Sequence, residues 1–253
     1  MLHLKELFFP PRCGACQELL PVSLQGDISM LCEDCAAQFK KEMMAQCKEC
    51  FLPIADCRCL PKIMAARGFT AHVKLALFSD TRYATARGLV LHLKQSADMR
   101  YYRELARLLR PNLVATMKVA EQGRAASGKL PINRTVIGYL PRTPAQKRRH
   151  GVDQAALLAK ALAREIGVPL LSLYRRRSGA RLQKELSRRE RFDNARLSLV
   201  LRRKAAKLSL TDCRVVLVDD VITTGASMAA AAELLQASEL IGVSIAVTPR
   251  AEK

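Results

Sequence analysis

The sequence is poor in aromatic residues and has no long apolar run. It contains no Trp and only 5% aromatic residues, although 49% of it is hydrophobic and 26% is charged. Its apolar runs fall short of the roughly 18 residues that a membrane-spanning helix needs, and its first residues show no signal-peptide pattern. We therefore expect a soluble cytoplasmic protein with a folded core. The shortage of aromatics also argues against a nucleic-acid module that works by base stacking.

Acidic residues are scarce as well, and their distribution is uneven. The chain has 42 Lys and Arg against 23 Asp and Glu, a net charge of +19. Residues 1–60 hold six basic and eight acidic side chains, which leaves residues 61–253 with 36 and 15, or net +21. Such an excess favours a polyanionic partner such as nucleic acid, or a phosphorylated substrate. Solvated surface charge without a partner is the alternative interpretation.

The nine cysteines divide the chain at the same place. Eight lie between Cys13 and Cys59, whereas Cys213 stands alone. They form three C-x2-C pairs and a final C-x-C pair, a spacing that predicts metal binding in a chain without a signal peptide. Two sites of four thiolates follow if the pairs are used in sequence order, and an interleaved pairing stays open. The predicted ligands are Cys13, Cys16, Cys32, Cys35, Cys47, Cys50, Cys57 and Cys59.

Four thiolates leave no open coordination position, so we expect two structural zinc ions rather than a catalytic metal. Residues 1–61 would then form a double zinc ribbon that needs metal to fold. A disulfide framework is the rival interpretation. Eight thiolates and two zinc ions would lower the charge of this module from −2 to about −6. We therefore expect nucleic acid to bind residues 62–253 instead.

The remainder of the chain alternates between strand and helix patterns. The pattern predicts strands over 72–78, 135–140, 214–218 and 241–247, and helices over 82–94, 99–109, 152–166 and 227–237. Pro111 is expected to stop the second helix and Gly167 to close the third. The segment 120–131 is expected to be a loop. Alternating strands and helices predict an α/β fold with a parallel sheet covered on both faces.

One segment carries recognisable chemistry. The apolar run 215–218 ends in Asp219 and Asp220, and the sequence Thr-Thr-Gly-Ala-Ser then opens a helix. Backbone N–H groups and hydroxyls in such a loop can bind phosphate, and Gly225 lets the backbone approach closely. Paired carboxylates beside an anion site suit a ligand that also carries a sugar diol. The segment therefore predicts a site for a ribose 5-phosphate unit. A turn with solvated Asp, or an acidic pocket of the response-regulator type, is the alternative.

Residues 215–227 resemble, position for position, the phosphoribosyl-pyrophosphate (PRPP) motif of type I phosphoribosyltransferases. With its N-terminal cysteines, the chain is similar to the ComF family (competence protein F and GntX-like proteins) over nearly its whole length. The family's other motifs match Leu93-Lys94, Pro141 with Gly151 and Gln154, and a stretch with Gln183, Leu186, Ser187, Arg191 and Asn194. The chain departs from the family at His150, Val152, Asp153 and Ala180, where Arg, Phe, Asn and Thr are usual.

The resemblance implies a type I phosphoribosyltransferase-like domain with a parallel sheet over residues 62–253, behind the double zinc ribbon. Asp219 and Asp220 would hold the ribose hydroxyls, and the 5-phosphate would bind Thr223, Thr224, Gly225, Ala226 and Ser227. Pyrophosphate would lie at Pro141 and Arg142, and Mg²⁺ would accompany PRPP. A basic hood over the site would include Gln183, Arg188, Arg191 and Asn194. The sequence reveals no base-activating residue, so no catalytic residue is assigned.

The function implied is that of a ComF-like protein that binds PRPP and single-stranded DNA. Its role would be DNA uptake in natural transformation or DNA processing, with competence or recombination proteins as partners. A nucleobase-salvage phosphoribosyltransferase is the first alternative. The second is a nucleic-acid-binding zinc protein with a vestigial PRPP pocket.

Overall fold

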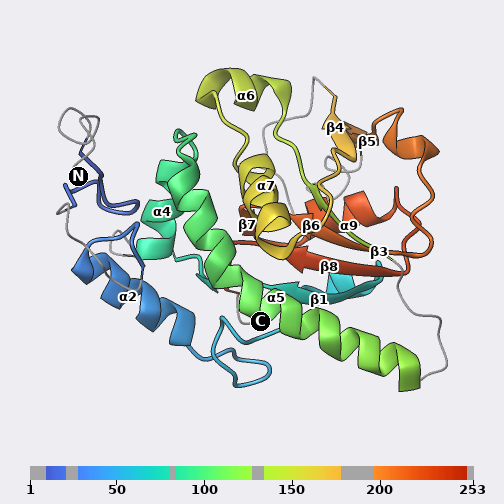
Figure 1. Cartoon of the computed structure of the whole chain (residues 1–253), viewed down its shortest axis with the longest axis horizontal. Helices are drawn as coiled ribbons and strands as arrows, with labels where there is room; N and C mark the ends of the chain where they lie inside the picture. The colour runs from blue at the N-terminus through green and yellow to red at the C-terminus, as the bar shows by residue number, and fades with distance from the viewer. Residues whose placement is uncertain (1–9, 21–27, 80–83, 127–133, 178–196, 250–253) are drawn as a thin grey trace.

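A four-stranded parallel sheet forms the centre of the molecule (Figure 1). The computed structural model describes residues 10–20, 28–79, 84–126, 134–177 and 197–249. The sheet order is β1 (Phe69–Val73), β8 (Glu239–Val243), β6 (Cys213–Val218) and β3 (Arg134–Tyr139). β2 (Ala76–Leu77), β9 (Ala246–Val247) and β7 (Val221–Ile222) form a small parallel sheet, and β4 (Tyr174–Arg176) pairs antiparallel with β5 (Leu199–Leu201).

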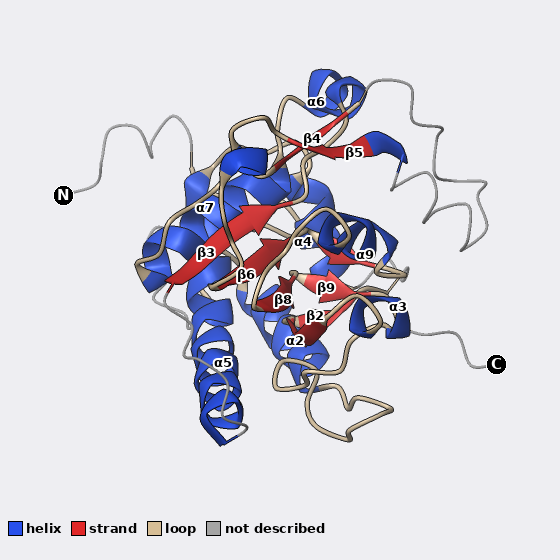
Figure 2. Ribbon diagram, turned by 90° about the vertical axis from the view of Figure 1, so that its right-hand side faces the viewer, coloured by secondary structure: helices blue, strands red, loops and turns tan. Residues whose placement is uncertain are grey.

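Helices cover both faces of this sheet (Figure 2). They are α2 (Glu33–Met44), α3 (Lys62–Ala65), α4 (Thr85–Leu93), α5 (Met99–Ala126), α6 (Pro144–His150), α7 (Gln154–Ile166) and α9 (Ala226–Ala232), with a short 3-10 turn η2 (Ala205–Lys207). Val216 and Val218 of β6 belong to an apolar cluster with α4, α5 and α7. Val215 and Leu217 belong to a second cluster with α3 and α9. Alternate residues of a strand therefore serve opposite faces, as the pleat requires.

The α/β fold with a parallel sheet, expected from the sequence, is confirmed. The strands at 135–140 and 214–218 correspond to β3 and β6, and the helix at 152–166 to α7, which ends at Gly167 with a left-handed φ of 71°. The expected strand over 72–78 is divided into β1 and β2, and that over 241–247 into β8 and β9. The helix after Gly225 ends earlier than expected, at Ala232.

The expected end of the second helix at Pro111 is wrong. α5 continues through this proline to Ala126, so the loop expected over 120–131 is helical in its described first half. Contacts with the cysteine-rich segment hold the helix beyond the proline. The side chain of Asn112 donates to the carbonyl of Ala55 at 2.8 Å, and Arg58 donates to the carbonyl of Asn112 at 3.2 Å. Tertiary hydrogen bonds thus offset the backbone bond that proline cannot make.

The first part of the cysteine-rich segment packs directly on the α/β core. Leu31 and Phe39 lie in the same apolar cluster as α4 and α5, and α2 lies against α4 (Figure 1). A Cβ added to Gly88 of α4 would lie 2.8 Å from the backbone oxygen of Ala15. This close contact explains why the helix needs glycine at that position. Among the described helices, none combines the length and apolarity needed to cross a bilayer.

Candidate functional site

Asp219 and Asp220 lie at the carboxyl end of β6, where parallel sheets of this kind bind ligands. The backbone N–H of Asp219 donates to the carbonyl of Val243 at 3.0 Å, and that of Ile245 donates to the carbonyl of Asp220 at 3.0 Å. The backbone of both aspartates is therefore fixed by the strand beside it, and the chain then enters β7.

The two carboxylates are partly buried and also accept backbone hydrogen bonds. The N–H of Asp220 donates to Oδ1 of Asp219 at 2.9 Å, and the N–H of Val221 to Oδ1 of Asp220 at 2.7 Å. Burial raises the pKa of Asp219 well above its ordinary value, and the negative charge of Asp220 raises it further. The site therefore holds two carboxylates at close quarters, which a ligand with hydroxyl donors would relieve.

The loop from Thr223 to Ser227 surrounds a small hollow of about 50 Å³ that Asp219 also lines. Gly225 has a left-handed φ of 81°, which glycine adopts without strain, and α9 begins directly after it. The hydroxyl of Thr224 accepts from the N–H of Ala226 at 3.3 Å. The five loop residues predicted to bind phosphate thus lie together, beside a carboxylate predicted to bind sugar.

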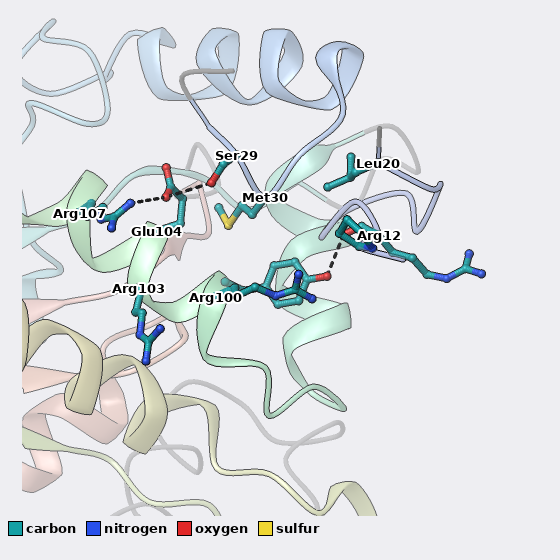
Figure 3. A pocket seen from close by; sticks show the side chains of 10 residues that line it. Arg12, Leu20, Ser29, Met30, Arg100, Arg103, Glu104 and Arg107 are labelled. Carbon is teal, nitrogen blue, oxygen red and sulfur yellow. Dashed lines mark hydrogen bonds and ion pairs between the residues drawn. The ribbon is translucent and has the colours of Figure 1, made fainter. Parts of the chain in front are cut away.

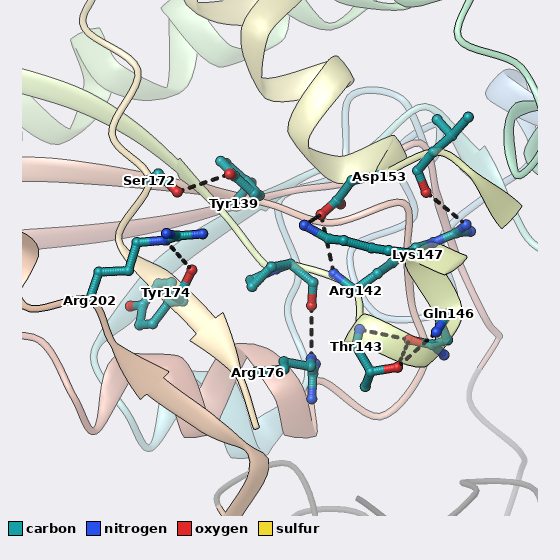
Figure 4. Close-up of polar contacts among 12 residues, drawn as sticks. Tyr139, Arg142, Thr143, Gln146, Lys147, Asp153, Ser172, Tyr174, Arg176 and Arg202 are labelled. Atoms are coloured by element: carbon teal, nitrogen blue, oxygen red, sulfur yellow. Dashed lines mark hydrogen bonds and ion pairs between the residues drawn. The ribbon is translucent and has the colours of Figure 1, made fainter. Parts of the chain in front are cut away.

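Arg176, which the sequence analysis did not single out, lies beside the candidate site. Its guanidinium donates to the carbonyl of Pro141 at 2.9 Å (Figure 4). It also donates to the hydroxyls of Ser198 at 2.9 Å and Ser227 at 3.4 Å. Burial lowers its pKa, whereas the negative charge of Asp219 opposes this shift. Arg176 thus places a positive charge between the Pro141 segment and the phosphate loop.

The alternation of β4 explains why the side chain of Arg176 lies at the site. It lies two residues after Tyr174, which is fully buried, and side chains two apart in a strand share a face. Arg175 between them is exposed. In the sequence alone, however, Arg176 belonged to a run of eight basic residues between 175 and 191, with nothing to distinguish it from its neighbours.

The side chain of Arg142 is used to hold neighbouring segments together (Figure 4). It donates to the carbonyl of Val152 at 3.1 Å, to that of Lys94 at 3.4 Å, and to Oε1 of Gln154. Its backbone N–H points to Oδ2 of Asp153 at 3.4 Å. The guanidinium therefore fixes the Pro141 segment against α4 and α7, and a role of Arg142 toward pyrophosphate stays a prediction.

Asp153, one of the departures from the ComF pattern, has a structural role here. Its Oδ2 forms an ion pair with Lys147 of α6 at 2.7 Å, in addition to the contact with Arg142 (Figure 4). Asp153 thus orders the turn beside the predicted pyrophosphate position. The predicted hood residues Gln183, Arg188, Arg191 and Asn194 lie outside the described residues.

The eight clustered cysteines form two groups, each with its Sγ atoms within 4.8 Å of one another. The first centre is Cys13, Cys16, Cys32 and Cys35, and the second centre is Cys47, Cys50, Cys57 and Cys59. The pairs are therefore used in sequence order, which excludes the interleaved arrangement. All of these cysteines are free thiols, so the disulfide alternative is not supported. Four converging sulfurs fit a tetrahedral thiolate-binding metal and leave it no open position.

The two centres share one local geometry. The residue after each first C-x2-C pair has a left-handed backbone, with φ of 68° at Gln17 and 59° at Phe51. Each donates its N–H to the carbonyl of the first cysteine of its pair, at 3.1 Å to Cys13 and 3.0 Å to Cys47. Each pair is therefore followed at once by a left-handed turn residue, Gln17 or Phe51. The N–H of Gly14 donates to the carbonyl of Met30 at 2.8 Å and not to sulfur.

The electrostatics of the thiols differ within each centre. Burial raises the pKa of Cys16 to about 11 and that of Cys59 to about 12. Burial also acts on Cys13 and Cys47, but backbone N–H groups donate to their sulfurs and the net pKa is lowered. The thiolate is the form that binds metal, and backbone N–H groups that donate to sulfur stabilise it.

Comparison with known proteins agrees with this arrangement. Residues 152–251 match the family model of the phosphoribosyl transferase domain. The match covers less than half of the chain and includes β6, both aspartates and the whole phosphate loop. No curated protein matches the sequence. The chain thus carries a phosphoribosyltransferase domain, preceded by two cysteine clusters that can bind metal.

Proposed function

We propose that this chain binds PRPP, with Asp219 and Asp220 on the ribose hydroxyls and residues 223–227 on the 5-phosphate. The observation that carries the proposal is the hollow in which this loop meets Asp219 at the carboxyl end of β6. A carboxylate accepts hydrogen bonds from a diol, whereas backbone N–H groups and hydroxyls donate to phosphate. The two halves of the site therefore suit the two halves of a ribose 5-phosphate.

Arg176 and the Pro141 segment support the direction in which PRPP would lie. The guanidinium of Arg176 lies between Ser227 of the loop and the carbonyl of Pro141. A pyrophosphate near Pro141 and Arg142 would then lie on the far side of the ribose from the 5-phosphate. Mg²⁺ bound with PRPP would neutralise charge on the pyrophosphate. Transfer to a nucleobase, the salvage alternative, would be detected as pyrophosphate release with a panel of bases.

We also propose that both cysteine centres hold zinc and that the chain is a ComF-like protein with a module boundary near residue 61. Thiolate donors in tetrahedral groups of four are typical of structural zinc. Both centres precede the phosphoribosyltransferase domain in the sequence, which is the order that the ComF resemblance implies. A ComF-like protein would act in the cytoplasm on incoming or processed DNA.

Calorimetry with PRPP and Mg²⁺ tests the central proposal. We expect Asp219→Asn combined with Asp220→Asn to weaken PRPP and ribose 5-phosphate about tenfold or more, with little effect on inorganic phosphate. Thr224→Val should weaken all three, because it removes a hydroxyl from the phosphate loop. The expected scale follows from about 1.5–3 kcal/mol per hydrogen bond to a charged group. Absence of binding by the wild type at millimolar PRPP would refute the proposal.

We also propose that the chain binds single-stranded DNA, supported by a basic hollow that shares no lining residue with the hollow at the phosphate loop. This hollow, of about 210 Å³, lies between the first cysteine centre and α5 (Figure 3). Its lining includes Arg12, Arg100, Arg103 and Arg107, with Glu104 the only acidic side chain. Figure 3 shows the guanidinium groups spread apart rather than converging on one point. Such a spread suits successive phosphates of a strand better than one compact anion.

A further inference from the structure

The second cysteine centre is connected to the phosphate loop by a short run of chain. Cys59 is followed by Leu60 and Pro61, and α3 then begins at Lys62. Met64 of α3 is fully buried, and a Cβ added to Gly225 would lie 2.8 Å from its Cγ and 3.1 Å from Cβ of Pro61. The phosphate loop therefore rests directly on the residues that follow the second centre.

Met64 also contacts the sheet beneath the loop. A Cβ added to Gly242 of β8 would lie 2.8 Å from Cε of Met64. Met64 thus lies against a glycine of the phosphate loop and a glycine of β8, between these two elements. A shift of α3 would be transmitted to Gly225, because a packed interior has no free space to absorb it.

Lys74 forms hydrogen bonds to the second centre. The ammonium group of Lys74, which is only 3% exposed, donates to the carbonyls of Cys57 at 3.1 Å and Cys59 at 2.9 Å. It also lies 3.3 Å from Sγ of Cys57. Four thiolates around a divalent cation carry a net charge of −2, which this buried ammonium partly neutralises. With a metal ion bound, the negatively charged second centre would attract the ammonium group of Lys74, which holds Cys57 and Cys59 in place.

A shared hollow provides another contact between the second centre and the loop. It has a volume of about 160 Å³, and Cys47, Cys57 and Cys59 line it together with Thr223. The first centre docks elsewhere: a Cβ at Gly14 would lie 3.1 Å from the ring of Tyr101, and Ala15 contacts Gly88 of α4. The two centres, alike in their ligands, therefore differ in what they support.

We propose that the metal at the second centre positions the phosphate loop, so that its binding and the binding of the 5-phosphate are thermodynamically coupled. This inference rests on the proposed PRPP function. The second centre fixes Cys57 and Cys59, these residues fix Pro61 and Met64, and Met64 supports Gly225. Cys13 of the first centre shares an apolar cluster with Val218 of β6, but no described contact joins this centre to Gly225 or Met64. We therefore expect its metal to be independent of the ligand. Coupling is reciprocal, and factors of about 5 to 150 are typical.

A zinc-competition titration of the wild-type full chain tests the coupling, and two cysteine variants then assign the zinc equivalent that responds. A chelating dye competes with the protein for zinc, in the presence and absence of saturating ribose 5-phosphate. This ligand needs no Mg²⁺. We expect the ligand to raise the apparent zinc affinity of one of two equivalents about tenfold, and to leave the other unchanged. Cys16→Ser should remove the insensitive equivalent and Cys50→Ser the sensitive one.

A matched pair of substitutions tests the path through Met64. Met64→Ala should weaken PRPP binding about tenfold in the zinc-loaded protein, measured by calorimetry. Met30→Ala is the control, because Met30 is also buried, at 4% exposed, but lies beside the first centre. We expect it to change PRPP affinity less than twofold, a change too small to count as coupling.

The outcomes separate this inference from the proposal on which it rests. If the wild type does not bind PRPP or ribose 5-phosphate, both fail together. If it binds them, but neither zinc equivalent responds or both respond equally, the coupling is refuted and the PRPP function stands. Equal PRPP affinity of Met64→Ala and Met30→Ala would likewise refute the path through Met64.

Discussion

Replacing Gly225 by Ala should destabilise the protein for two reasons that can be measured separately. The residue has a left-handed φ of 81°, a conformation that costs an L-residue about 1–2 kcal/mol. In addition, the new Cβ would lie 2.8 Å from Cγ and 3.0 Å from Sδ of Met64. Overpacking of this kind costs about 1–3 kcal/mol. We therefore expect Gly225→Ala to lower the free energy of unfolding by about 2–5 kcal/mol.

Gly167→Ala is the matched control for the backbone contribution. Gly167 has a similar φ of 71°, and a Cβ added there meets nothing within 4 Å. It should therefore cost only the backbone share, about 1–2 kcal/mol. The difference between the two variants, about 1–3 kcal/mol, measures how closely Met64 approaches the phosphate loop.

Urea unfolding of the zinc-loaded protein measures both losses, as midpoint shifts at constant m value. Met64→Ala removes the obstructing atoms, so combining it with Gly225→Ala should give less than the sum of the single losses. The expected shortfall is about 0.5–3 kcal/mol for residues in contact. Equal losses for Gly225→Ala and Gly167→Ala, together with simple additivity in the double variant, would refute the close contact.

Three further predictions follow from the site, the metal centres and the charge. Asp219→Asn should stabilise the empty protein by about 0.5–2 kcal/mol at neutral pH while weakening PRPP. Because the pKa of folded Asp219 is raised above the ordinary 3.8, its stability contribution is full at acid pH and is lost as pH rises. The gain in melting temperature from Asp219→Asn should therefore grow from about pH 4 upward, and a constant gain would contradict the raised pKa. Elemental analysis should find two zinc ions per chain, and Cys16→Ser or Cys50→Ser should each lose one; absence of zinc would overturn this assignment. Single-stranded DNA binding should weaken with salt, and Arg103→Ala should reduce the slope of log K against log salt by about 0.7. If residues 1–61 alone bind single-stranded DNA as tightly as the whole chain, the assignment of DNA binding to the arginines of α5 is wrong.

The sequence alone predicts those features whose geometry depends on a short segment of the chain. The C-x2-C pairs, the strand before Asp219 and the loop around Gly225 were all recognised because their chemistry depends on neighbours within a few residues. The binding role of the loop stays a prediction, but its position at the carboxyl end of β6 agrees with the structure. Buried parallel strands were equally clear, since continuous apolar runs such as 215–218 are typical of them.

Long-range contacts decided what the sequence could not. Proline lacks an N–H group, so Pro111 predicts a helix end. The helix nevertheless continues, because Asn112 is hydrogen-bonded to Arg58 and Ala55 of the cysteine-rich segment. The grouping of the cysteines was also undecided, because spacing alone allows more than one tetrahedral pairing. Only the folded chain places each group of four sulfurs within 4.8 Å.

The most consequential contacts join residues that have no relation in sequence. Arg176 reaches the phosphate loop and Pro141 from a separate ribbon, and Met64 lies beneath Gly225 although about two-thirds of the chain separates them. Local propensity and motif spacing describe interactions within one element, and from them most strands, the turns and the candidate ligands can be predicted. Which of these elements meet depends on how their apolar faces are buried together, and that is a property of the tertiary structure alone.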